Sequence, residues 1–120
     1  MAIRMKRVYE APADEDGYRV LVDRLWPRGL SEHAARVDLW LRGIAPTTEL
    51  RTWYGHDVQR WPEFRERYRV ELSQHGDLLD LIRDIERHRE VVTLVFGAKD
   101  AEHSQAAVLL DILGGRGSPS

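Results

Sequence analysis

The sequence contains no cysteine, and this absence excludes several kinds of chemistry at once. Disulfides, thiolate catalysis and cysteine-based zinc sites are impossible without it. Long hydrophobic runs are also missing, because no stretch approaches the roughly 18 apolar residues of a membrane-spanning helix. The first seven residues lack the apolar core of a secretory signal. We therefore expect a cytoplasmic protein with no membrane partner.

A basic excess is missing as well. Lysine and arginine number 18 and aspartate and glutamate 20, so the formal net charge is −2. Because binders of duplex DNA usually carry a basic surplus, we expect no such partner. The sequence has neither an HExxH motif nor a glycine-rich phosphate loop. We expect no bound metal and no cofactor.

The chain is long enough for one domain with a sizeable core. A chain of 120 residues buries roughly two-thirds of its unfolded surface on folding. We predict a single domain over residues 1–113. The final residues, 114–120, are rich in glycine and serine, and this composition predicts a disordered tail.

Short apolar runs alternate with stripes of helical period along the chain. The runs predict strands at residues 3–9, 18–25, 37–42 and 91–96. Capping residues and apolar spacing predict helices at 32–36, 48–54, 61–72, 77–85 and 101–113, with N-caps at Ser31, Thr47 or Thr48, Asp77 and Asp100. Strands separated by helices favour a parallel sheet. We therefore expect an α/β fold, a single three-layer domain with a small, mostly parallel sheet flanked by helices.

The strand predicted at 91–96 is apolar on both faces and rich in β-branched residues, so it should be central and covered on both sides. In an open α/β sheet, ligands bind just past the carboxyl ends of the strands, near the N-termini of the following helices. This rule directs attention to the polar residues that follow the strands at 18–25 and 91–96.

The first polar segment, 23–29, contains two arginines around a proline–glycine turn. Arg24 and Arg28 could clamp a phosphate or carboxylate, because a guanidinium matches two anionic oxygens. Asp23 could orient one arginine or act as a base, and Trp26 could wall a pocket. The structural alternative is an Asp–Arg pair that holds the loop, with Trp26 in the core.

The second polar segment, 97–103, follows the central strand. Asp100 is predicted to cap the last helix, which would place His103 in its first turn and favour the neutral imidazole. A neutral imidazole there could act as a general base, and Lys99 could attract an anion. The alternative is an ordinary capped helix start with exposed side chains.

The third segment, 53–57, joins two predicted helices. Trp53 and Tyr54 could line a pocket or stack on a planar ligand, and His56 could contact that ligand. The alternative places Trp53 in the core and leaves His56 as a solvated turn residue.

Together with residues 38–41 and 45–51, these three segments resemble the YeaO-like branch of the domain-of-unknown-function family 488. The resemblance extends over residues 3–113. It implies a small, single-domain prokaryotic protein with an α/β fold, and it brings no assigned activity. The recurring polar positions of the family fall here on Asp23, Arg24, Arg28, Gly29, His56, Lys99, Asp100 and His103. The resemblance thus implies that the three segments form one site.

Three functions are compatible with this pattern. The first is an enzyme for a small phosphorylated or carboxylated substrate, in which the basic residues bind the anion and His103 or Asp23 moves a proton. The second is a non-catalytic module that binds a ligand, a nucleic-acid end or a protein. The third is a structural protein in which the same polar side chains form a buried network.

Overall fold

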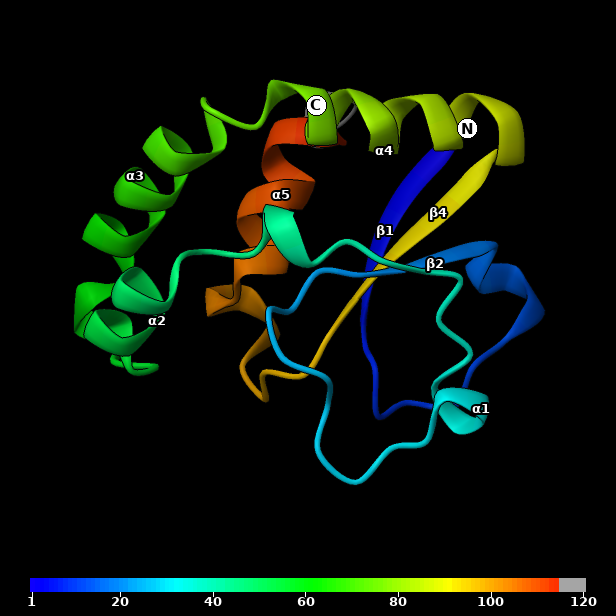
Figure 1. Ribbon diagram of the computed structural model, residues 1–120, viewed down its shortest axis with the longest axis horizontal. Helices are drawn as coiled ribbons and strands as arrows, with labels where there is room; N and C mark the ends of the chain where they lie inside the picture. Colours follow the sequence, from blue (N-terminus) through cyan, green and yellow to red (C-terminus); the bar gives the residue numbers. More distant parts are fainter. Residues whose placement is uncertain (115–120) are drawn as a thin grey trace.

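The fold is built on a sheet of four parallel strands. The computed structural model describes residues 1–114. The strands lie in the order β1-β4-β2-β3, with bounds β1 Ala2–Arg7, β2 Tyr18–Leu21, β3 Leu39–Trp40 and β4 Val91–Phe96. All three pairings are parallel (Figure 1), which confirms the predicted parallel sheet.

The strand β4 is the centre of the sheet, as its sequence predicts. It pairs with β1 on one side and with β2 on the other, so that Val92 lies beside both Ile3 and Tyr18. Residues 92–96 are all buried. A β-branched and aromatic run suits this position, because side chains pack against it from both faces.

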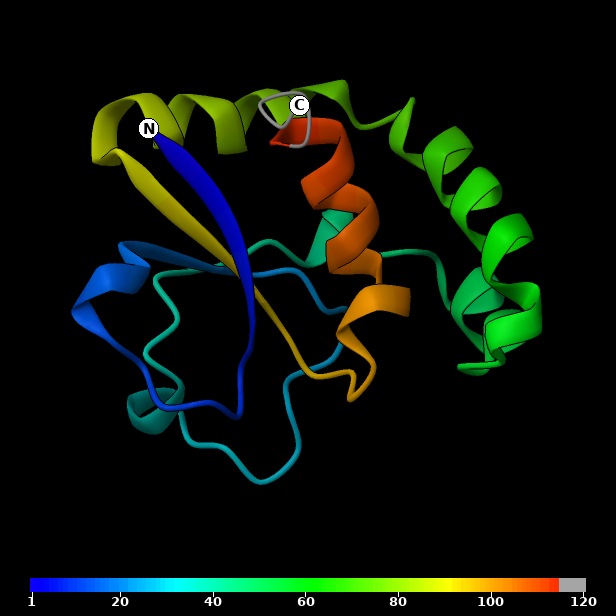
Figure 2. The ribbon, with the colours of Figure 1, turned by 180° about the vertical axis from the view of Figure 1, so that it is seen from behind.

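The four longer helices share one hydrophobic core with one face of the sheet. These helices are α2 Thr48–Tyr54, α3 Trp61–Leu72, α4 Gly76–Arg89 and α5 Gln105–Leu113. Phe64 and Tyr68 of α3 and Leu109 of α5 pack in the same cluster as Leu94 of β4. Figures 1 and 2 show α5 beside the sheet and α3 farther out. The sheet is therefore covered here by a complete helical layer.

The opposite face has a thinner cover. The one-turn helix α1 Glu32–Ala35 and the loops around it pack there. Leu21 and Val95 of the sheet contact this cover, to which Trp26 and Trp40 also belong. The α/β class is confirmed, with one layer of helices and one layer made mainly of loops.

Several helix ends lie where the capping residues of the sequence predict them. Ser31 caps α1 by accepting a hydrogen bond from the backbone N–H of Ala34, and Thr47 caps α2 by accepting from Leu50. Gly55 ends α2 with a left-handed backbone at φ 53°. Such caps satisfy terminal backbone groups that have no partner within the helix.

The strand boundaries differ from prediction. The strand β2 stops at Leu21 and β3 contains only two residues. Beyond Leu21 one further ladder bond remains, from the N–H of Val22 to the carbonyl of Val95. Of the apolar residues predicted to extend β2, Val22 is buried in the core, whereas Leu25 is exposed.

Two predicted caps were wrong. Asp77 lies inside α4, which begins at Gly76. Asp100 does not cap the last helix, since a single 3-10 turn at Ala101–His103 comes first and Ser104 caps α5 by accepting from the N–H of Ala107. His103 therefore lies before the α-helix and outside its first turn.

A buried ionic group lies at the amino end of the sheet. Asp16 accepts from Arg19 over 2.6 Å and from Lys6 over 3.1 Å. The guanidinium of Arg19 also donates to the carbonyls of Ala35 and Arg36. Burial opposes ionisation of Asp16, but the backbone N–H of Ala13 and the two cations outweigh it and hold its pKa below the ordinary value. This group ties β1 and β2 to α1.

The tail predicted at 114–120 lies, apart from Gly114, outside the residues that the structure describes. Within residues 1–114, no helix combines the length and the apolar character needed to cross a membrane.

Candidate functional site

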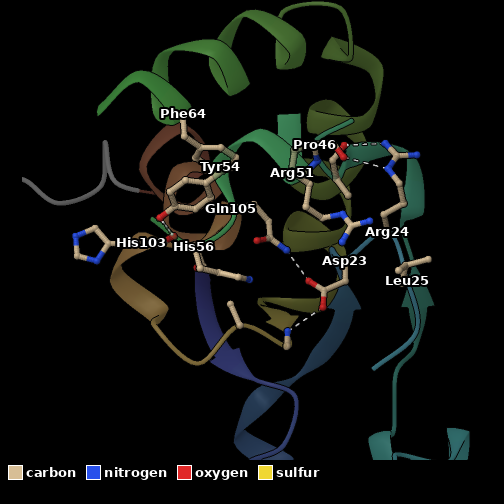
Figure 3. A pocket seen from close by; sticks show the side chains of 14 residues that line it. Asp23, Arg24, Leu25, Pro46, Arg51, Tyr54, His56, Phe64, His103 and Gln105 are labelled. Carbon is tan, nitrogen blue, oxygen red and sulfur yellow. Dashed lines mark hydrogen bonds between the residues drawn. The ribbon is translucent and has the colours of Figure 1, made fainter. Parts of the chain in front are cut away.

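A cavity of about 240 Å³ opens where β2 and β4 end, which is the edge of the sheet that the sequence indicates. Its wall is drawn from the loop after β2, the segment before α2, the helix α2, and the chain after β4 (Figure 3). The lining side chains are those of Asp23, Arg24, Leu25, Ala45, Pro46, Arg51, Tyr54, His56, Phe64, Ala98, His103, Ser104 and Gln105, together with Gly97.

Asp23 is the carboxylate of this cavity. One of its oxygens accepts from the backbone N–H of Gly97 over 2.9 Å, and the other accepts from the side-chain amide of Gln105 over 2.5 Å. Burial raises the pKa of Asp23 to about 6, although these hydrogen bonds oppose the rise. The positive charges of Arg51 and His56 oppose it too. Asp23 can therefore exchange a proton near neutral pH.

The backbone that meets Asp23 approaches it so closely that a side chain at Gly97 would crowd the carboxylate. A Cβ atom on Gly97 would lie 3.0 Å from the nearer carboxylate oxygen of Asp23. Arg7 of β1 holds this segment from the other side, donating to the carbonyl of Ala98 over 2.9 Å and to that of Gly97 over 3.4 Å. Arg7 thus donates to the carbonyls of Gly97 and Ala98, while the N–H of Gly97 donates to Asp23.

The predicted arginine clamp does not form. Arg24 donates to the backbone carbonyls of Pro46 and Ala45, each over 3.0 Å, so its guanidinium holds the segment before α2. Arg28 is exposed and does not line the cavity, because the loop between β2 and α1 extends away from the helices (Figure 1). Of these two arginines only Arg24 lines the cavity, and its Nε and Nη2 atoms already donate to backbone carbonyls.

Of the three side chains predicted for the site in segment 97–103, one lines the cavity. Lys99 and Asp100 are exposed and lie outside the cavity lining. His103 lines the cavity, but its Nδ1 lies 2.7 Å from a carboxylate oxygen of Asp100 and its ring packs edge-on against Trp61. The hydrogen bond with His103 lowers the pKa of Asp100. Figure 3 shows the imidazole turned away from Asp23, so the two proposed catalytic groups do not face each other.

Neither predicted tryptophan lines the cavity. Trp26 packs edge-on against Trp40 at 5.4 Å between ring centroids, in the core of the opposite face. Trp53 lies beneath the guanidinium of Arg67, 4.5 Å from its ring centroid. The aromatic wall consists instead of Tyr54 and Phe64, whose stacked rings lie 4.3 Å apart.

His56 does reach the cavity, as its turn position allowed. It has a left-handed backbone at φ 59°, directly after the left-handed Gly55. Such a conformation is uncommon for residues other than glycine. The two successive left-handed residues end α2 abruptly, and Figure 3 shows the imidazole extending toward the space around Asp23.

The lining residues that the sequence reasoning missed include Arg51, Phe64 and Gln105. Arg51 lies one helical turn before Gly55 on α2, a spacing that could have pointed to it. Its side chain forms no hydrogen bond or ion pair with any residue in 1–114, and His56 likewise forms none within that range. Figure 3 shows both extending toward the space that Asp23 faces. Among the same residues, no three histidine, aspartate or glutamate side chains are grouped to hold a metal ion.

A parallel sheet of four strands, with a cavity of mixed polar and apolar lining at its carboxyl edge, defines a small α/β protein with a candidate ligand site. The chain belongs to the DUF488-N3i family, described as the inactive DUF488-N3 subclade, whose profile matches residues 2–117. The uncharacterized protein Rv3073c of Mycobacterium tuberculosis is 43% identical over 114 residues, covering 95% of each chain. The uncharacterized protein YeaO of Escherichia coli is 42% identical over 113 residues, covering 94% of this chain and 97% of that protein. No solved structure matches the chain significantly.

Proposed function

We propose that this protein is a non-catalytic module that binds a small anionic ligand in the cavity at the carboxyl edge of the sheet. The observation that carries the proposal is the pair Arg51 and His56. Both line the cavity and are exposed, and neither side chain forms a hydrogen bond or ion pair within residues 1–114. A guanidinium without a protein partner is suited to two oxygens of a carboxylate or phosphate.

The dimensions and walls of the cavity support a small ligand. Sites for drug-sized molecules commonly occupy about 300–1,000 Å³, whereas this cavity has about 240 Å³. The stacked rings of Tyr54 and Phe64 give the cavity an apolar wall beside its charged groups, a combination common in ligand sites.

A binding role is favoured over catalysis because the hydroxyl groups that line the cavity, the candidate nucleophiles, already donate to backbone carbonyls. The hydroxyl of Ser104 donates to the carbonyl of Ala101 and caps α5, and the hydroxyl of Tyr54 donates to the carbonyl of His103. The description of the family as inactive points in the same direction.

Proton-transfer catalysis is the second candidate, and the raised pKa of Asp23 favours it, because an acid–base group works best near the pH of the reaction. Incubation with ethyl phosphate followed by phosphorus NMR separates the two functions. A binding module leaves the ester intact. Hydrolysis that disappears in Asp23→Asn would make the protein an enzyme.

Calorimetric titration of the protein with ethyl phosphate at low ionic strength tests the binding itself. We expect Arg51→Gln to weaken binding about tenfold or more, as expected for loss of a charge-assisted hydrogen bond. Arg28→Gln is the matched control, since this exposed arginine lies outside the cavity, and it should bind as the wild type does. Absence of wild-type binding at millimolar concentrations, or equal affinity in Arg51→Gln, would overturn the proposal.

A further inference from the structure

The cavity contains a negative pole as well as a positive one. The carboxylate of Asp23 is held by one N–H donor on each oxygen, from Gly97 and Gln105. A carboxylate oxygen can accept two hydrogen bonds, so each oxygen keeps one acceptor position. Asp23 is therefore fixed in direction and still able to accept donors from a ligand.

Within the described part of the chain, residues 1–114, no cation forms an ion pair with this carboxylate, although Arg51 and His56 are near enough to lower its pKa. Burial is the larger influence and raises that pKa, which is the behaviour of a partly desolvated carboxylate without a close counter-ion. A ligand cation placed against Asp23 would supply the missing charge.

The negative group, Asp23, and the positive group, Arg51, face the same space in the cavity. Figure 3 shows Arg51 from α2 above Asp23, with His56 entering from the side and Gln105 between them. A purely anionic ligand would satisfy Arg51 but would bring a second negative charge toward Asp23. A ligand with separated charges satisfies both poles.

Resting on the proposed binding function, we infer that the ligand is a small zwitterion, whose primary ammonium binds Asp23 while its phosphate or carboxylate binds Arg51. A short linker between the two charges fits a cavity of this size. The ammonium offers three donors, enough for the open acceptor positions of Asp23.

The test compares two probes that differ only in the positive charge. Phosphoethanolamine carries an ammonium and a phosphate, and ethyl phosphate carries the same phosphate without the ammonium. We expect the wild type to bind phosphoethanolamine about tenfold more tightly in calorimetric titration, because a charge-assisted hydrogen bond to a desolvated carboxylate is gained. Equal affinity for the two probes would overturn the inference while leaving the anion site intact.

The variant Asp23→Asn provides a second test of the inference. An asparagine there can accept from the N–H of Gly97 and donate to Gln105 once that amide is rotated, so the fold has a satisfactory arrangement. In this variant the preference for phosphoethanolamine should disappear, and binding of ethyl phosphate should persist or tighten. A preference that survives Asp23→Asn would overturn the inference. If the variant does not fold, the comparison of probes on the wild type still decides.

Arg51→Gln separates this inference from the proposed function. It should weaken both probes, whereas Asp23→Asn should weaken only phosphoethanolamine. If the wild type binds neither probe, both the function and the inference fail. Sedimentation with phosphatidylethanolamine vesicles, compared with phosphatidylcholine vesicles, distinguishes a lipid headgroup from a free metabolite as the source of the same chemistry.

Discussion

The indole N–H of Trp40 donates to the backbone carbonyl of Asp23 over 2.7 Å. Trp40 belongs to β3, at the edge of the sheet, and packs against Trp26 in the cover of the opposite face. The guanidinium of Arg42 lies 4.0 Å from the Trp40 ring centroid. The backbone of Asp23, the residue that carries the carboxylate of the cavity, is therefore held from the other side of the sheet.

Replacing Trp40 by phenylalanine should disturb Asp23. The variant keeps an aromatic ring but removes the donor, so we expect a loss of about 1–3 kcal/mol in the free energy of unfolding. Urea denaturation measures this loss. Trp26→Phe is the matched control, because it also removes an indole N–H, the one that donates to the carbonyl of Leu30. Only Trp40→Phe should change the titration of Asp23 in carboxyl NMR, and an equal change in both variants would contradict this assignment.

Asp23 should make the protein less stable as pH rises. Its pKa is about 6 in the folded state and close to the ordinary 3.8 when unfolded. Between these values the folded state binds more protons, so the free energy of unfolding falls with rising pH, by about 3 kcal/mol from this group. Its stabilising contribution is complete below about pH 4 and lost above about pH 6. Asp23→Asn should remove this pH dependence, and an unchanged profile measured by urea denaturation would refute the assignment.

Asp16 should be essential to stability. Asp16→Asn leaves Arg19, which is 3% exposed, with a buried charge that has lost its counter-ion. Breaking such a buried pair costs about 3–5 kcal/mol. Asp84→Asn removes an aspartate from an exposed pair of the same spacing, with Arg87, and should cost less than about 1 kcal/mol. Thermal denaturation of both variants checks the contrast.

The contribution of Asp16 to stability depends on pH in the opposite sense to that of Asp23. Because the pKa of Asp16 is lowered on folding, its contribution is present above the ordinary value and is lost as pH falls through the folded value. Acid denaturation of Asp16→Asn should therefore be less steep than that of the wild type. Equal steepness would contradict the ionic role.

Gly17 should tolerate no side chain. Its φ is +64°, and a Cβ atom there would lie 2.3 Å from the carbonyl oxygen of Val91. We expect Gly17→Ala to cost more than about 3 kcal/mol, because the clash is with backbone at the start of β4. Gly29 also has a positive φ, +82°, but open space around it, so Gly29→Ala should cost about 1 kcal/mol. Similar losses for both variants, measured by urea denaturation, would mean that backbone conformation alone decides.

Local signals in the sequence predicted much of the fold. The β-branched run of β4 requires cover on both faces, and Thr47 and Gly55 carry the chemistry of a helix start and a helix end. These properties depend on a few neighbouring residues and need no knowledge of distant contacts. The location of the cavity followed from the parallel topology.

The identity of the cationic residue could not be predicted in the same way. Arg24, Arg28 and Arg51 are equally plausible in sequence, since each lies near the end of a predicted element. The tertiary structure distinguishes the three. Arg24 donates to backbone carbonyls, and the loop that contains Arg28 places it outside the cavity. Arg51 lines the cavity without a hydrogen bond or ion pair within residues 1–114. Gln105 was missed because the start of α5 was predicted four residues too early, at Ala101.

The contact of Arg7 with the chain after β4 sets an order on the formation of the site. Arg7 and Ala98 are 91 positions apart in the sequence. Within residues 1–114 the strand β1 pairs with β4 alone, so β1 has no partner strand in this sheet until the residues that lie between Arg7 and Val91 have been synthesised as well. The loop that positions the N–H of Gly97 toward Asp23 is completed only when these two distant segments meet. Completion of the cavity is consequently a late event in biosynthesis, and a nascent chain truncated before β4 carries Arg51 and Asp23 without the segment that closes the cavity around them.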